Sequence, residues 1–188
     1  NTNAMDSTTK RIAINYGLIV SAIAVGYTLV TYIINEAWMS SQVGGVLMLL
    51  AILVVPYFGV REFKKANEGY ATFREAFSAY LLPLIFSAVV GLGFNWLLHN
   101  VIDADLATRT GERIYEQFAE MPEEQRQGVM TFMGAGNEAE LKAKSIEMAT
   151  EQATFMGILK STGIGIIMYA VIGLIVAAVT KKNRPEFQ

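Results

Sequence analysis

The sequence predicts an all-α integral membrane protein, in which four spanning helices form a bundle and an extracytoplasmic helical hairpin lies between spans three and four. The first observation behind this prediction is a set of four apolar runs, at residues 12–34, 42–60, 76–98 and 157–180. Each run is about long enough to cross a ~30 Å hydrocarbon core at ~1.5 Å per helical residue. The chain, residues 1–188, is therefore expected to form a single membrane domain.

The placement of charge is the second observation. Hydrophobic residues make up 53% of the chain and the mean hydropathy is +0.35, which are high values for a soluble domain. Nine of the fifteen basic residues lie at the ends that four spans bring together: Lys10, Arg11, Arg61, Lys64, Lys65, Arg74, Lys181, Lys182 and Arg184. The segment 100–156 holds eleven acidic and five basic residues. Because cytoplasmic segments are rich in Lys and Arg, we expect both termini in the cytoplasm.

The first two spans are predicted to form an antiparallel hairpin, because only a short connection separates them. The first follows Ser7, Thr8 and Thr9, whose hydroxyls suit a helix start. It is too long for the apolar core of a signal peptide. Pro56 lies in the last turns of the second span, where a kink is tolerated if a neighbouring helix or water satisfies the freed carbonyl.

A helix-start signal and aromatic residues place the third span. Thr72 and Glu75 have the spacing of a capping box, in which a hydroxyl and a carboxylate cover unpaired N–H groups. Aromatic side chains concentrate at membrane interfaces, and Trp38 and Trp96 fall at the expected outer ends. Tyrosines gather toward the expected inner ends: Tyr16, Tyr57, Tyr70 and Tyr80.

The external segment 100–156 is expected to be helical. It has too few apolar residues to fold alone, so it should rest on the spans or on a partner. Pro122 begins a short helix that Gly134 ends. Asn137 begins the next helix, and no Pro or Gly follows until Gly157. The sequence therefore predicts one helix from Asn137 to Thr180, about 66 Å long at ~1.5 Å per residue.

The connection between spans two and three carries the stretch Asn67-Glu68-Gly69-Tyr70-Ala71-Thr72-Phe73-Arg74-Glu75-Ala76-Phe77. This stretch resembles a motif of the family labelled domain of unknown function 4199, small bacterial membrane proteins found mainly in Bacteroidota. The outline is also similar, since an acidic, Met-bearing external segment precedes a last span that ends in basic residues. The resemblance implies a multi-pass protein of the bacterial inner (cytoplasmic) membrane, and it implies no activity.

The residues that catalysis requires are scarce. There is no cysteine, no Gly-x-Ser-x-Gly elbow and no phosphate-binding Gly-rich motif. His99 is the single histidine; with Asp103 it makes two candidate ligands, fewer than a zinc site requires, so we expect an interfacial role instead. Asn15 and Asn95 are embedded amides, each expected to bond a backbone carbonyl or interfacial water. We expect no enzymatic activity, no metal, no cofactor and no nucleic-acid partner.

Small residues recur every four positions along the last span: Gly157, Ser161, Gly165, Gly173 and Ala177. Small side chains let helices approach closely in lipid, where packing drives association. Two interpretations stay open. This face packs within the four-helix bundle, or it forms the interface of a homo-oligomer or of a partner helix.

The external segment carries a second candidate surface of Met and Phe side chains: Phe118, Met121, Met130, Phe132 and Met133. Methionine adapts to varied partners, so these residues form a docking surface or pack on the outer ends of the spans. The leading functional hypothesis is a non-catalytic membrane subunit or scaffold, either self-associating or part of a larger envelope complex. The alternative is a channel or carrier for an uncharged or lipid-like solute. Membrane lipid and a homo-oligomer or membrane-protein partner are the expected partners.

Overall fold

The computed structural model describes residues 2–40 and 42–185. Within them the fold is all-α, as predicted, with seven α-helices, two short helical turns and no β-strand. In chain order the elements are α1 (Thr2–Ile34), η1 (Glu36–Ser40), α2 (Gln42–Ala66), α3 (Phe73–Leu97), η2 (Leu98–Ile102), α4 (Leu106–Ala119), α5 (Glu123–Met133), α6 (Glu138–Ala153) and α7 (Phe155–Thr180).

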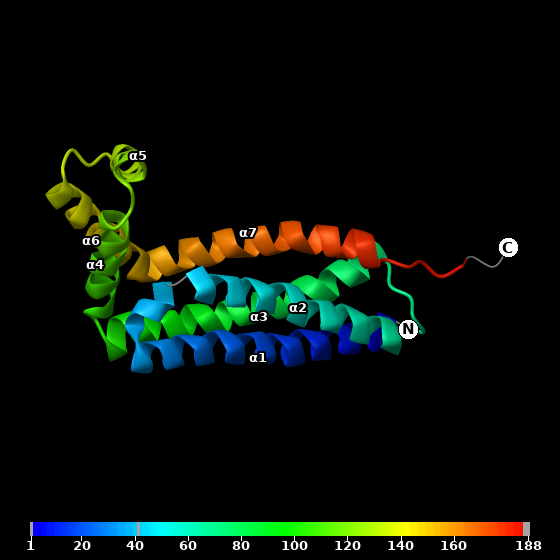
Figure 1. The fold of residues 1–188 in the computed structure, drawn as a ribbon. Coiled ribbons are helices and arrows are strands. Elements are labelled where there is room, and N and C mark those ends of the chain that lie inside the picture. Colours follow the sequence, from blue (N-terminus) through cyan, green and yellow to red (C-terminus); the bar gives the residue numbers. More distant parts are fainter. Residues whose placement is uncertain (1, 41, 186–188) are drawn as a thin grey trace.

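Four long helices form an elongated bundle, and three short ones cross one end of it (Figure 1). Both termini lie at the opposite end, which we call the basic end; we call α4–α6 the helical cap and the end they cover the capped end. Helix α3 packs against α1, α2 and α7 and is the centre of the bundle. The four long helices are long and apolar enough to cross a membrane. The chain is therefore a multi-pass membrane protein.

Most predicted helix boundaries follow from local signals, but the first is wrong. Thr72 caps α3: its hydroxyl accepts a hydrogen bond from Glu75 N, and the Glu75 carboxylate accepts one from Thr72 N. Asn137 caps α6 by accepting from Glu140 N. Helix α1, however, begins at Thr2. Ser7, Thr8 and Thr9 therefore lie inside it, and no helix start follows them.

The predicted single helix over residues 137–180 is also wrong, because the chain turns at Thr154. Its backbone is extended (φ −66°, ψ 156°), and its hydroxyl accepts from Gly157 N at 3.0 Å, which starts α7 anew. A Cβ on Gly157 would lie 2.2 Å from the Glu151 carbonyl oxygen. Glycine is therefore required at this corner, and the cap folds over the bundle end instead of extending away from it.

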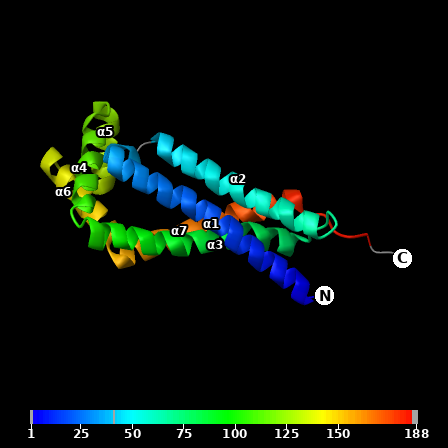
Figure 2. The same ribbon diagram turned by 90° about the horizontal axis from the view of Figure 1, so that it is seen from below.

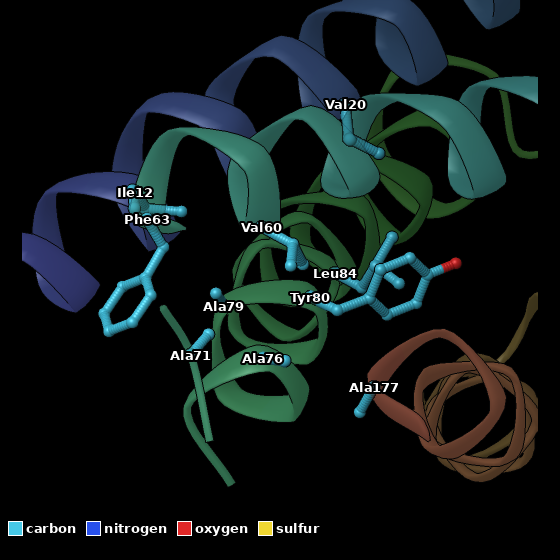
Figure 3. Close-up of a cluster of buried hydrophobic side chains, with 10 residues drawn as sticks. All are labelled: Ile12, Val20, Val60, Phe63, Ala71, Ala76, Ala79, Tyr80, Leu84 and Ala177. Atoms are coloured by element: carbon cyan, nitrogen blue, oxygen red, sulfur yellow. The ribbon is translucent and has the colours of Figure 1, made fainter. Parts of the chain in front are cut away.

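The core of the bundle lies nearer the basic end and gathers buried side chains of all four long helices, among them Ile12, Val60, Tyr80 and Ala177 (Figure 3). Tyr80 is fully buried between α2 and α7, so its side chain packs inside the bundle. Its hydroxyl donates to the Ile52 carbonyl at 3.2 Å. Ile52 lies four residues before Pro56, which has no N–H to offer that carbonyl. Tyr80 therefore satisfies the backbone group that the proline leaves unpaired.

The loop that carries the family-like stretch holds the end of α7. Ala71 and Lys182 exchange two backbone hydrogen bonds, at 2.9 and 2.8 Å, in an isolated antiparallel bridge. Lys64 Nζ donates to the Thr180 carbonyl at 2.8 Å. Two successive residues with positive φ, Glu68 (56°) and Gly69 (88°), turn the chain back to make these contacts. At the basic end the loop thus ties α7 to α2 and α3.

Candidate functional site

A cavity of about 260 Å³, which we call the bundle cavity, lies in the half of the bundle next to the helical cap. Val20 and Ala24 of α1 and Met48, Ala51 and Ile52 of α2 line one side of it. Helices α3 and α7 line the other side. The cavity is half open, and its apolar walls belong to the membrane-spanning helices.

The bundle cavity exists because α7 approaches α3 closely only near the basic end. A Cβ on Gly173 would lie 3.2 Å from the rings of Phe77 and Tyr80. At Gly165, two turns earlier, the nearest atoms lie 3.8 Å away and belong to Tyr169 of the same helix. Helix α7 therefore packs tightly on α3 near the basic end, and space remains beside α7 nearer the cap.

Helices α2 and α7 lie apart near the bundle cavity. Figure 2 shows α2 running obliquely, close to α3 and α7 near the basic end and away from them toward the cap. In the described part of the chain α7 packs on α3 and α6, and it has no comparable packing with α1 or α2. Helices α2 and α7 thus both line the cavity without packing on each other.

Hydroxyl and amide groups interrupt the apolar lining. Asn95 Nδ2 donates to the Gly91 carbonyl at 2.9 Å, as predicted for this embedded amide. The hydroxyls of Ser87, Thr162 and Tyr169 also line the cavity; no described residue hydrogen-bonds to them. In a membrane interior an unpaired polar group costs free energy because no water replaces its partner. These hydroxyls can therefore hydrogen-bond to a molecule inside the cavity.

A second chamber of about 270 Å³, the cap chamber, adjoins the bundle cavity at the capped end. The two share Asn95, Ser161 and Thr162 as lining residues. Helices α4 and α6 cover the cap chamber, and His99 of η2 lines it. His99 Nδ1 is buried without a hydrogen-bond partner among the described residues. In the part of the chain that the structure describes, no Asp, Glu, Lys or Arg lines either space.

An ion-pair network fastens the helical cap to the first helical hairpin. Arg109 Nη2 of α4 lies 2.8 Å from a Glu36 carboxylate oxygen of η1 and 2.6 Å from one of Asp103. Arg113 Nη2 lies 2.5 Å from Glu36, and the Tyr32 hydroxyl donates to Asp103 at 3.0 Å. Hydrogen bonds from Arg109 lower the pKa of Asp103 to about 2 and also lower the pKa of Glu36. Two carboxylates and two guanidiniums leave this network without net charge.

Within the cap, α4 and α6 pack very closely. A Cβ on Gly111 would lie 2.5 Å from Ile146 Cα and 2.9 Å from the Ser145 carbonyl oxygen. Ser145 is fully buried at this contact, and Leu141 is fully buried one turn away. The cap is therefore a packed layer that covers the cap chamber.

The predicted small-residue face divides into three parts. Gly157 lies at the corner between α6 and α7. Ser161 and Gly165 line the bundle cavity, and Ser161 also lines the cap chamber. Gly173 and Ala177 are buried against α3. The last two residues are therefore used for packing within the chain.

The predicted docking surface also divides. Phe118, Met121, Met130 and Met133 are half-buried, whereas Phe132 is 91% exposed. Phe132 lies on α5, which has no buried residue. Lys144 Nζ of α6 donates to the Met133 carbonyl at 2.8 Å and so holds the end of α5. Four of these side chains are thus partly covered within the cap, and Phe132 is left in solvent.

His99 and Asp103, the two candidate metal ligands, have different surroundings. Asp103 belongs to the ion-pair network, while His99 lines the cap chamber. In the described residues no group of three or more His, Cys, Asp or Glu side chains is placed to hold a metal ion. Sequence reasoning assigned no role to Glu36, Arg109 or Arg113, because pairs 73 and 77 residues apart carry no local signal.

Comparison with known proteins identifies the family of this chain. Residues 15–182 match the family described as "Protein of unknown function (DUF4199)". The match extends from the first span to the basic residues after the last, and it includes the stretch at 67–77 that carried the resemblance. No curated protein matches the chain, and no solved structure matches it.

Proposed function

This chain belongs to the DUF4199 family of proteins of unknown function, and we propose that it is a non-catalytic membrane protein that binds an uncharged, lipid-like molecule between α2, α3 and α7. The observation that carries this proposal is the half-open bundle cavity, bounded by α2 on one side and α7 on the other. A membrane-dissolved molecule reaches such a cavity sideways, without crossing the lipid headgroups.

The side chains that line the bundle cavity determine which class of molecule can bind there. Apolar side chains such as Val20, Ile52 and Leu84 suit a hydrocarbon chain, and the scattered hydroxyls supply a few hydrogen bonds. A charge placed in a low-dielectric site requires a partner of opposite charge. Since no acidic or basic side chain of residues 2–40 or 42–185 lines the cavity, an uncharged molecule is favoured over an ion.

The packing of the bundle favours a binding protein or carrier over an open channel. The core between the bundle cavity and the basic end is filled by residues such as Phe63, Tyr80 and Ala177. A continuous pore would require α7 to leave α3, which Gly173 holds at close range. We infer that the cavity exchanges its contents on the membrane side or at the capped end.

The orientation follows from the basic residues. We propose that the chain lies in a bacterial inner membrane with the basic end in the cytoplasm and the acidic cap outside. Nine of the fifteen Lys and Arg residues flank the spans at the basic end. In this orientation the bundle cavity lies in the outer leaflet.

Partner binding is the second candidate function, that of a membrane subunit or scaffold. The observation that favours it is Phe132, which is 91% exposed on a helix with no buried residue. A large aromatic side chain in water is typical of an interface anchor. Light scattering in mild detergent tests this candidate, since a subunit or oligomer has a particle mass above one chain. Phe132→Ser should then reduce the mass to that of the single chain.

Retained lipid tests the leading proposal. The full chain is purified in mild detergent, washed extensively and extracted with organic solvent, and the retained molecules are identified by mass spectrometry. We expect about one lipid-like molecule per chain. Gly165→Leu fills the bundle cavity and should abolish retention. Gly163→Leu is the matched control, because Gly163 is exposed on the same helix with no atom within 4 Å of a Cβ there.

Two results would overturn the proposal. One is a wild-type protein that retains no molecule beyond the exchangeable detergent and lipid shell. The other is equal retention by Gly165→Leu and Gly163→Leu, which would place the bound molecule outside the cavity.

A further inference from the structure

We propose that the cap chamber binds the head of the bound molecule, and that this head is a neutral hydroxyl or carbonyl group hydrogen-bonded to His99. This inference rests on the proposed function and names its ligand class, a neutral lipid such as a monoacylglycerol.

The two adjoining spaces together suit an amphiphilic molecule, which has an apolar chain and a polar head. They adjoin at Asn95, Ser161 and Thr162. The bundle cavity extends from there into the apolar middle of the bundle, past Leu84. The cap chamber extends the other way, beneath Thr110 of α4 and Gln152 of α6. A single molecule can therefore place its chain among the spans and its head beneath the cap.

The charge of the site excludes an ionised head. Among the described residues no Asp, Glu, Lys or Arg lines either space, and the ionisable side chains there are His99 and Tyr169. In the ion-pair network at the capped end, Arg109 and Arg113 are already bonded to Glu36 and Asp103. A phosphate or carboxylate head would find no available cation in the lining, and an ammonium head would find no carboxylate.

His99 supplies the specific contact. In a neutral imidazole one ring nitrogen donates a hydrogen bond and the other accepts one. Nδ1 is buried and has no partner among the described residues, which lowers stability unless a bound molecule or water completes it. A hydroxyl can donate to Nδ1 or accept from it, and a carbonyl can accept from it. Asn95, whose Nδ2 bonds to Gly91, lies on the same wall.

Paired probes test the inference on the full chain in detergent. The probes are 1-oleoylglycerol, with a neutral dihydroxyl head, and 1-oleoyl lysophosphatidate, which carries the same chain on an anionic head. Native mass spectrometry across a titration measures the binding of each. We expect saturable binding of 1-oleoylglycerol at one site, and binding of lysophosphatidate at least about tenfold weaker, because its phosphate would be desolvated with no cation beside it.

Substitutions at His99 locate the head. His99→Phe keeps a ring but removes both nitrogens, and it should weaken 1-oleoylglycerol binding about tenfold. His99→Gln restores a donor and an acceptor and should recover most of the affinity. Leu97→Phe is the control for an added ring, because Leu97 is exposed at the end of α3, two residues before His99, and it should leave binding unchanged.

The results of these binding experiments distinguish failure of the neutral-head inference from failure of the proposed function. Equal or tighter binding of lysophosphatidate, or unchanged 1-oleoylglycerol binding by His99→Phe, overturns the neutral-head inference while a lipid-binding cavity stands. Failure of both probes to bind, together with no retained molecule in the purified wild type, removes the proposed function itself. If His99→Phe does not fold, the other two variants decide. Loss of 1-oleoylglycerol binding in both His99→Gln and the control Leu97→Phe would show that the loss does not depend on the imidazole, which would contradict the inference.

Discussion

The two halves of the bundle use the same helices in opposite ways. Near the basic end α7 lies against α3, seated by Gly173 and held by the Ala71–Lys182 bridge. Near the capped end α7 continues past Gly165, with no neighbouring helix close to that glycine, and a cavity opens toward α2. The comparison teaches that a run of small residues marks close packing only where another helix fills the space it leaves.

The two halves of the bundle also differ in whether their polar side chains have hydrogen-bond partners. In the closed half Tyr80 bonds to Ile52, and Lys64 bonds to the last carbonyl of α7. In the open half the hydroxyls of Ser87 and Tyr169 have no hydrogen-bond partner among the described residues. Fully bonded polar groups fix one structure, whereas unpaired ones at a cavity are available to a ligand.

The largest expected effect comes from overpacking the closed half. Gly173→Leu places a side chain against Phe77 and Tyr80, where even a Cβ would lie 3.2 Å away. We expect a loss of about 3 kcal/mol in the free energy of unfolding, measured by denaturant titration in detergent. The same change at Gly165 should cost less than about 1 kcal/mol, because space is available there. Equal losses at both glycines would contradict the distinction between the halves.

The hydrogen bond of Tyr80 gives the next largest effect. Tyr80→Phe leaves the Ile52 carbonyl unpaired in the core, which should cost about 2 kcal/mol. Pro56→Ala supplies a backbone N–H for that carbonyl, so the double variant should lose clearly less than the sum of the two single changes. Additive losses in the same unfolding measurement would show that the Tyr80 hydroxyl does not replace the hydrogen bond that Pro56 cannot make to the Ile52 carbonyl.

Removal of the ion-pair network should loosen the capped end alone. Arg109→Met leaves Glu36 and Asp103 with fewer partners, and we expect amide hydrogen exchange in α4 to rise about tenfold. Exchange in the core of α3 should stay unchanged. Arg126→Met is the control, since Arg126 pairs with Glu123 and Glu138 inside the cap and does not tie it to α1 or η1.

Acid should act on the same network, with a smaller effect. The pKa of Asp103 is lowered to about 2 from an ordinary value of 3.8, so its contribution is complete above about pH 4 and is lost as the pH falls toward 2. Hydrogen exchange in α4 should therefore rise over this interval. Asp103→Asn should remove most of this dependence, leaving the part that Glu36 contributes through its own lowered pKa.

The smallest expected effect concerns the bridge at the basic end. Lys182→Pro removes the N–H that donates to the Ala71 carbonyl. We expect a loss of less than about 1 kcal/mol, seen as increased exchange at Ala71 with little change in global unfolding. Asn183→Pro, which leaves both bridge donors in place, is the control. A large global loss would mean that the bridge, rather than Gly173, holds α7.

Local signals explain why much of this fold is predictable. Each span contains enough apolar residues to satisfy a membrane on its own, and Thr72 and Asn137 cap helices through residues three positions away. The turn at Thr154 escaped prediction, although Thr154 and Gly157 carry it. The apolar and helical character of the flanking residues is equally compatible with a straight helix, and only packing of the cap over the bundle end selects the turn.

The sequence by itself determined the all-α class, the four long helices and the segregation of charge, because hydropathy and helix capping act within a few residues. The tertiary structure alone decided the bundle cavity, the network around Arg109 and the pairing of Tyr80 with Ile52. These features join residues from different helices, so they depend on the angles at which the helices cross. In lipid those angles follow from the fit of facing side chains, which periodicity along one helix does not encode.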